Sequence, residues 1–96
     1  MIRVVLEVDN FNQWFSSLYV LFNGVYRSVR FKIDTGCNAL VLSHFKDIGR
    51  NVPVCGADAV CHSTRQTNDL LGTEVLRQFT DISFKLSDKK YLELMK

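Results

Sequence analysis

Alternating apolar and polar residues predict β-strands along much of this chain. Ile2–Val8 is rich in β-branched residues and alternates polar with apolar positions, which is typical of a strand. Two further apolar segments, Leu18–Phe22 and Val25–Asp34, flank Asn23 and Gly24. Because Asn-Gly favours the tight turns that join antiparallel strands, this region predicts a β-hairpin whose second strand ends at Asp34.

The segments on either side of this hairpin are less regular. Asp9–Ser17 is mostly polar and contains a Trp14-Phe15 pair, so we expect a connection whose aromatic side chains pad the core. After the hairpin, Ala39–Leu42 predicts a short strand. Residues 43–49 predict a brief helical turn, with a serine as its cap and a glycine at its end.

The second half of the chain predicts more strands and one helix. Asn51–Cys55 and Ala59–His62 are expected to form either a hairpin, with Gly-Ala-Asp between its strands, or one bent strand. Residues 63–69 are polar and predict a loop. Thr73 opens a helix whose apolar face consists of Val75, Leu76 and Phe79.

The end of the chain predicts a closing pair of strands. Ile82, Phe84 and Leu86 alternate with polar residues, a turn follows, and Tyr91–Met95 returns as a last strand. The whole pattern is β-rich with one definite helix, and it contains no internal repeat, linker or low-complexity segment.

The composition limits the classes of protein to consider. Ninety-six residues, 47% of them hydrophobic and 23% charged, indicate one small globular domain over residues 1–96. A net charge of +2 without a basic stripe gives no support for nucleic-acid binding. No apolar run is long enough for a membrane span, and the amino terminus lacks a signal-peptide pattern.

The cysteines indicate a reducing compartment. Cys37, Cys55 and Cys61 are odd in number and irregularly spaced, which argues against a disulfide framework and for a cytoplasmic location. A soluble domain of a larger protein is the alternative for the chain as a whole. Cys55 and Cys61, with His62 and His44, match no zinc-binding spacing, so we expect no metal site and interpret these residues as structural.

Candidate chemistry concentrates at Asp34, which follows an apolar strand and precedes Thr35 and Gly36. A carboxylate beside a small hydroxyl residue and a glycine can be hydrogen-bonded by its own loop and approached closely by another backbone. The alternative is that Asp34 merely begins a turn, since all three residue types are common in turns.

Two motifs together give this chain the pattern of a known family. They are Asp-Thr-Gly at 34–36 and Leu-Leu-Gly at 70–72, and the second precedes a predicted short helix and closing hairpin. Over residues 20–94 the chain resembles the retropepsin-like aspartic proteases. The resemblance implies an all-β, closed-barrel-like lobe with one short C-terminal helix, and a two-fold homodimer of such lobes. It implies no cofactor.

The resemblance also implies roles for individual residues. Asp34 of each protomer would supply one of two carboxylates that activate a water, one as base and one as acid. Thr35 would bond across the dimer axis, and Gly36 and Gly72 would allow close backbone approach. Ala39 and Leu71 would reach the side-chain pockets, although a core role is the alternative for both.

Two further expectations concern residues next to the site and at the end of the chain. Cys37 is interpreted as a packing residue and not as a nucleophile, because no histidine is placed by a motif to activate it. The closing strand, with Tyr91, Leu92 and Leu94, would by analogy help to build the dimer sheet.

The chain departs from the family between its two motifs. Retropepsin-like domains carry a flap, a β-hairpin that closes over substrate, but here the interval is short. Within residues 50–69, either the segment 51–63 is a stunted flap, or it is the strand that normally follows a flap that is missing.

Three functional hypotheses follow. The first is a homodimeric aspartic endopeptidase that cleaves extended peptides with apolar side chains near the scissile bond. The second is a retropepsin-like dimerisation or peptide-binding module with little or no hydrolysis. The third is a small β-barrel that binds nucleic acid or another ligand, and it lacks the basic face that nucleic-acid binding would need.

Overall fold

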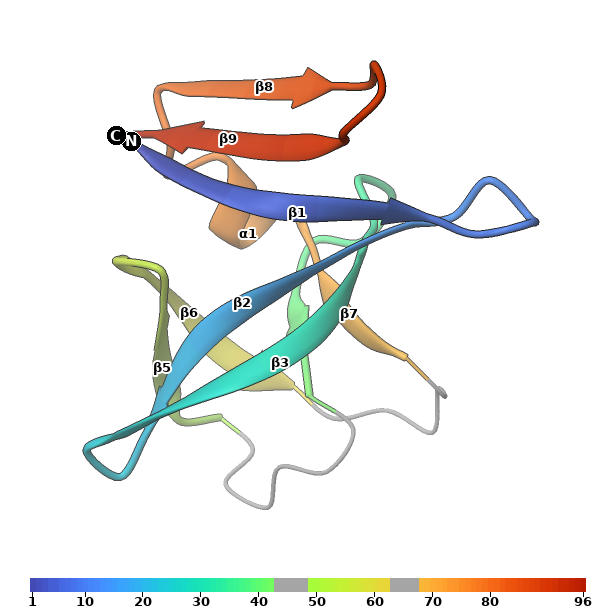
Figure 1. Ribbon diagram of the computed structural model, residues 1–96. Helices are drawn as coiled ribbons and strands as arrows, with labels where there is room; N and C mark the ends of the chain where they lie inside the picture. Colours follow the sequence, from blue (N-terminus) through green and yellow to red (C-terminus); the bar gives the residue numbers. More distant parts are fainter. Residues whose placement is uncertain (43–48, 63–67) are drawn as a thin grey trace.

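The computed structural model describes residues 1–42, 49–62 and 68–96. Within these ranges the chain forms nine strands and one short helix (Figure 1). In chain order they are β1 (Ile2–Val8), β2 (Trp14–Phe22), β3 (Val25–Ile33), β4 (Leu40–Val41), β5 (Asn51–Val54), β6 (Ala57–His62), β7 (Asp69–Leu71), α1 (Thr73–Leu76), β8 (Asp81–Lys85) and β9 (Tyr91–Met95).

Six of the strands close into a barrel. The strand order β3-β7-β4-β6-β5-β2 returns to its start because β2 also pairs with β3. Two of the pairings, β3 with β7 and β4 with β6, are parallel and join strands that are distant in sequence. The expectation of an all-β, closed-barrel-like lobe is therefore confirmed.

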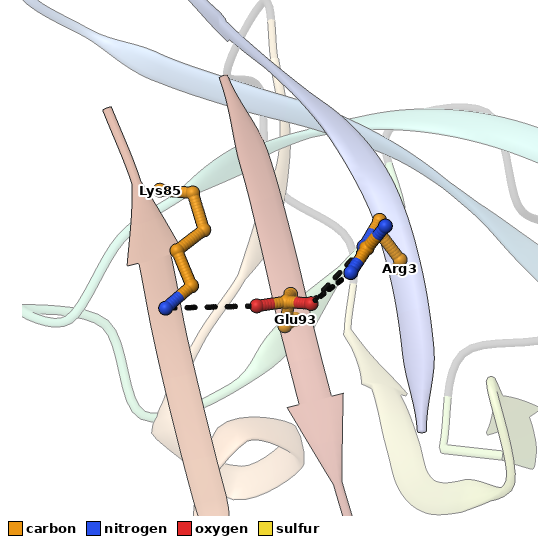
Figure 2. A network of polar contacts seen from close by, with 3 residues as sticks. All are labelled: Arg3, Lys85 and Glu93. Carbon is orange, nitrogen blue, oxygen red and sulfur yellow. Dashed lines mark hydrogen bonds and ion pairs between the residues drawn. The ribbon is translucent and has the colours of Figure 1, made fainter. Parts of the chain in front are cut away.

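The remaining strands, β1, β9 and β8, form a three-stranded extension that joins the barrel through the pairing of β1 with β2. Figure 1 shows β8 and β9 above α1 and the two ends of the chain side by side on β1 and β9. An ion-pair network crosses its three strands. Glu93 on β9 accepts from Arg3 Nη2 on β1 at 2.9 Å and lies 3.9 Å from Lys85 Nζ on β8 (Figure 2).

The core lies inside the barrel and beneath the three-stranded sheet. Its largest fully buried side chains come from seven different strands and from α1, so almost every element contributes to one cluster. The members with the least exposed surface include Leu18, Phe31, Leu40, Leu71 and Leu92. Burying these apolar side chains is the main source of stability for so small a lobe.

The Asn23-Gly24 hairpin is confirmed. Asn23 has φ 47° and Gly24 has φ 80°, so both central residues adopt the left-handed conformation that a tight two-residue hairpin turn requires. The flanking strands pair in register from Phe22↔Val25 onward. The second strand ends at Ile33, which places Asp34 just beyond it.

The expected connection over Asp9–Ser17 is partly wrong, because β2 begins at Trp14. Its first residues pair with β1 on one side and with β3 on the other, as in Glu7↔Phe15 and Phe15↔Lys32. The expectation that the aromatic residues pad the core holds for Phe15, which is buried. Trp14 is half-buried, and its ring packs against Phe84 at a centroid distance of 5.0 Å.

Of the two alternatives for the middle of the chain, the structure has the hairpin. Its turn lies at Cys55 and Gly56, with φ 49° and 84°, and not at Gly-Ala-Asp, because Ala57 and Asp58 already belong to β6. The residues of β6 alternate between buried and exposed positions, and Val52 and Val54 of β5 are buried. The β5–β6 hairpin is therefore part of the barrel wall.

The predicted helix is confirmed but short. Its α-helical part spans only Thr73–Leu76, and Val75, Leu76 and Phe79 are buried as expected. The two closing strands are also confirmed, although β8 ends at Lys85 and leaves Leu86 half exposed.

The brief helical turn expected over 43–49 falls, except for its final glycine, outside the described residues. No helix in the described ranges is long and apolar enough to cross a membrane.

Candidate active site

Asp34 is held at the end of β3 by the neighbouring strand β7. The parallel pairing of β3 with β7 ends at Ile33↔Leu71. One residue further, the backbone N–H of Asp34 donates to the carbonyl of Leu71 at 3.1 Å. The residue with the candidate carboxylate is thus tied by its backbone to the segment that carries the second motif.

The Asp34 carboxylate organises its own loop. The N–H of Gly36 donates to Asp34 Oδ1 at 3.0 Å, and the N–H of Cys37 donates to the Asp34 carbonyl at 3.2 Å. Asp34 therefore does begin a turn, as the alternative interpretation held, and its side chain is half-buried while Thr35 and Gly36 are exposed. A turn of this kind presents the carboxylate at the surface with a fixed backbone.

Gly72 crosses this loop at very short range. A Cβ atom at Gly72 would lie 2.4 Å from the Cys37 carbonyl oxygen and 2.5 Å from the Ala39 carbonyl oxygen. Its φ of −98° is accessible to any residue, so glycine is required here for space and not for conformation. The expected close approach of the two motifs is therefore present in the geometry of the chain.

The crossing continues into the helix. The N–H groups of Thr73 and Glu74, at the start of α1, donate to the carbonyls of Cys37 and Asn38, both at 2.9 Å. These amides belong to the first turn of a helix, where N–H groups have no partner within the helix. Here the loop that follows Asp34 supplies the acceptors.

The structure brings most of the residues singled out in the sequence into one place. Asp34, Gly36, Ala39, Leu71 and Gly72 all lie in this loop crossing. Leu71 is fully buried and pairs with Leu40 of β4, so its side chain belongs to the core. Ala39 is half-buried, with its backbone against Gly72.

The cysteines have distinct surroundings, since Cys37 and Cys55 are half-buried and Cys61 is buried. Cys37 is half-buried, and its Sγ lies 3.5 Å from the Ala39 carbonyl oxygen. Burial raises the pKa of the Cys55 thiol above its ordinary value, and a hydrogen bond with the Tyr19 backbone opposes this only in part. Among the described residues, no group of three or more His, Cys, Asp or Glu side chains could hold a metal ion.

Two residues near the site were not singled out by the sequence. Glu74 Oε1 accepts from the N–H of Val60 at 3.2 Å, and Gln78 Oε1 accepts from the N–H of Asp58 at 3.0 Å. Both side chains extend from α1 or the turn after it to β6. In the sequence, the only indication was that the two residues are four positions apart and so share one face of a helix. This spacing does not predict which strand they contact.

Comparison with known proteins supports the fold. No family model and no curated protein matches the chain. Among solved structures, the crystal structure of a retropepsin-like aspartic protease from Rickettsia conorii is similar, with a TM-score of 0.61 and 14% sequence identity. The match covers 99% of this chain and 93% of that one. At this identity the likeness concerns the fold, and the chain has an all-β, retropepsin-like fold.

Proposed function

We propose that the chain is an aspartic endopeptidase that acts as a homodimer, with Asp34 of each protomer as its catalytic residue. The observation that carries the proposal is the loop crossing. A carboxylate with a fixed backbone lies at the surface of a retropepsin-like lobe, held by the Leu71 carbonyl and by the backbone of its own turn.

The chemistry requires two such carboxylates. A water held between them is deprotonated by the ionised carboxylate, while the protonated one polarises the scissile carbonyl. Two carboxylates about 3 Å apart share one proton because both cannot ionise at that distance, and this division provides the base and the acid. The resulting titration belongs to the pair and not to either residue.

A two-fold dimer supplies the second carboxylate. The chain carries one Asp-Thr-Gly sequence, and an isologous interface places each residue opposite its own copy. Thr35 and Gly36 are exposed beside Asp34 and are therefore open to contact with a second loop. In this proposal the separate protomer is inactive, and the substrate is an extended peptide with apolar side chains.

The terminal strands would contribute to the dimer through their backbone or their outward side chains. Leu92 and Leu94 are at most 1% exposed within one protomer, so these two side chains are already used by its own core. In the described strand order β8 is the last strand of its sheet. Such an edge can accept another strand.

A second candidate function is a dimerisation or peptide-binding module with little or no hydrolysis. It is favoured by the position of the β5–β6 hairpin, whose residues Val52, Val54 and Ala57 are buried in the barrel wall. This packing supports the interpretation of the segment as the strand that follows a missing flap. Without a flap, substrate would be clamped less firmly and water excluded less well.

Peptide hydrolysis at mildly acidic pH, with Asp34→Asn as the matched variant, tests the proposal. An asparagine Oδ1 can still accept the Gly36 N–H, so we expect the variant to keep its fold and to lose hydrolysis completely. Circular dichroism and thermal unfolding check the fold. Equal turnover by both proteins would contradict the proposal, and binding of peptide without turnover by either would favour the module.

A further inference from the structure

Within the described part of the chain, one edge of β6 has no strand partner from Ala57 to Val60. Because Pro53 has no N–H, the register pair Pro53↔Asp58 cannot exchange hydrogen bonds between β5 and β6. The N–H of Asp58 therefore points away from β5, and so does that of Val60 two residues later. On this other side, β4 pairs only with Cys61 and His62.

Side chains from α1 and the turn after it take the place of the missing strand. Glu74 accepts from the Val60 N–H, and Gln78 accepts from the Asp58 N–H. The Gln78 amide also returns a hydrogen bond, because its Nε2 donates to the Asp58 carbonyl at 2.5 Å and to the Glu74 carbonyl at 2.8 Å. The two side chains thus pair with the edge of β6 as a strand backbone would.

Glu74 contacts two parts of the molecule at once. Its side chain bonds to β6, while its backbone N–H bonds to the Asn38 carbonyl in the loop that follows Asp34. The helix that carries it has only four residues and no side-chain cap, so little within the helix itself fixes its position. Its position depends on contacts of this kind and on the burial of Val75 and Leu76.

We infer that Glu74 is a positioning residue for the Asp34 loop. Its carboxylate anchors the start of α1 to the barrel, and the α1 amides in turn hold the carbonyls of Cys37 and Asn38. Gly72 is packed directly against the same loop, so the start of α1 and the loop cannot move closer together. The effect on loop order is independent of the proposed function, whereas any effect on hydrolysis rests on it.

Amide hydrogen exchange measured by NMR tests the inference without an activity assay. The probes are the N–H groups of Asp34, Gly36, Cys37 and Thr73, which all make hydrogen bonds in the loop crossing. Glu74→Ala removes the acceptor, and Glu74→Gln keeps an oxygen that can accept the same bond. Glu7→Ala is the matched control, because it removes an exposed ion pair with Arg30 elsewhere on the sheet.

We expect Glu74→Ala to raise exchange at these amides at least tenfold more than at the core amides of β2, and Glu74→Gln to restore protection. Glu7→Ala should leave them unchanged. A uniform rise across the chain in Glu74→Ala, or no rise at all, would overturn the inference. If Glu74→Ala does not fold, Glu74→Asp, whose carboxylate is one methylene shorter, serves as the milder variant with the same expectations.

The catalytic consequence is tested on the dimer with a peptide substrate. We expect Glu74→Ala to lower kcat about tenfold with KM unchanged, and to shift the pH profile, because the displaced carboxylates interact at a different distance and share their proton differently. A rise in KM alone would contradict this consequence. If the wild-type protein hydrolyses no peptide, the proposed function fails, while the exchange experiment still decides whether Glu74 positions the loop.

Discussion

Gly72 shows how a single residue can be fixed by steric contact alone. Its backbone conformation is open to every amino acid, but two carbonyl oxygens of the Asp34 loop occupy the space that a side chain would need. Any larger residue must push the loop and the start of α1 apart. The same displacement would break the Thr73 hydrogen bond to Cys37.

We therefore expect Gly72→Ala to lower the free energy of unfolding by about 3 kcal/mol or more, as measured by urea denaturation. Gly24→Ala is the control, because Gly24 has open space around it and only a positive φ of 80°. That change should cost about 1 kcal/mol. Equal losses for both variants would show that the loop crossing is not tightly packed.

Cys55 permits a prediction about pH. Burial favours the neutral thiol and raises its pKa, so the folded state holds this proton more firmly than the unfolded chain does. The resulting stabilisation is present below the ordinary thiol pKa, about 8.5, and is lost as the pH rises through the higher folded value.

We expect alkylation of Cys55, mapped by mass spectrometry across pH 7–10, to reach its half-maximal rate at a higher pH than a free peptide thiol does. The free energy of unfolding should also fall more steeply above about pH 9 in the wild type than in Cys55→Ala. Alkylation that follows the peptide thiol at every pH would contradict the assigned effect of burial.

At the scale of elements, the two tight hairpin turns differ in how well their residues suit the left-handed backbone conformation. Both have positive φ at both central residues, but the first uses Asn23 and the second Cys55. Asparagine adopts the left-handed conformation more readily than most residues other than glycine, whereas cysteine does not. The turn of the β5–β6 hairpin therefore contains local strain.

Cys55→Asn is expected to raise the free energy of unfolding by about 0.5–1 kcal/mol, as measured by chemical denaturation. Cys55→Ala removes the same thiol but keeps a side chain with no preference for this conformation, and it should bring no such gain. If both variants change stability equally, the effect comes from the thiol and not from the turn.

Local patterns in the sequence predicted elements better than they predicted boundaries. The Asn23-Gly24 hairpin, β1, the helix face and the closing strands follow from neighbouring residues alone. The start of β2 at Trp14 did not, because Ser16 and Ser17 interrupt the apolar alternation. These residues are in a strand because β1 and β3 flank them, and those pairings are tertiary.

The candidate site was predicted as a set of residues but not as a geometry. Asp34 and Gly72 could be singled out from their motifs and from the resemblance that the two motifs carry. The contact of Gly72 with two carbonyls, and the bonds from Glu74 and Gln78 to β6, depend on pairings between segments far apart in sequence. Periodicity contains no information about such pairings.

At the scale of the whole molecule, the proposed mechanism ties activity to association. If each site needs Asp34 from two chains, the active species is the dimer, and its fraction depends on total concentration. Activity per milligram should then fall as the protein is diluted below its dissociation constant, and the dimer fraction measured by analytical ultracentrifugation should fall in parallel. Constant specific activity in samples shown to be monomeric would contradict a shared site.

The pairing of β1 with β9 has a consequence for the order of folding. Ile2 lies opposite Leu94, so β1 acquires this neighbour only after β2 to β8 have been synthesised. The β2–β3 hairpin, in contrast, can form as soon as its own residues leave the ribosome, because its pairing is local. Until β9 arrives, the inner face of β1, with Ile2 and Val4, is exposed during synthesis to chaperones and to other nascent chains.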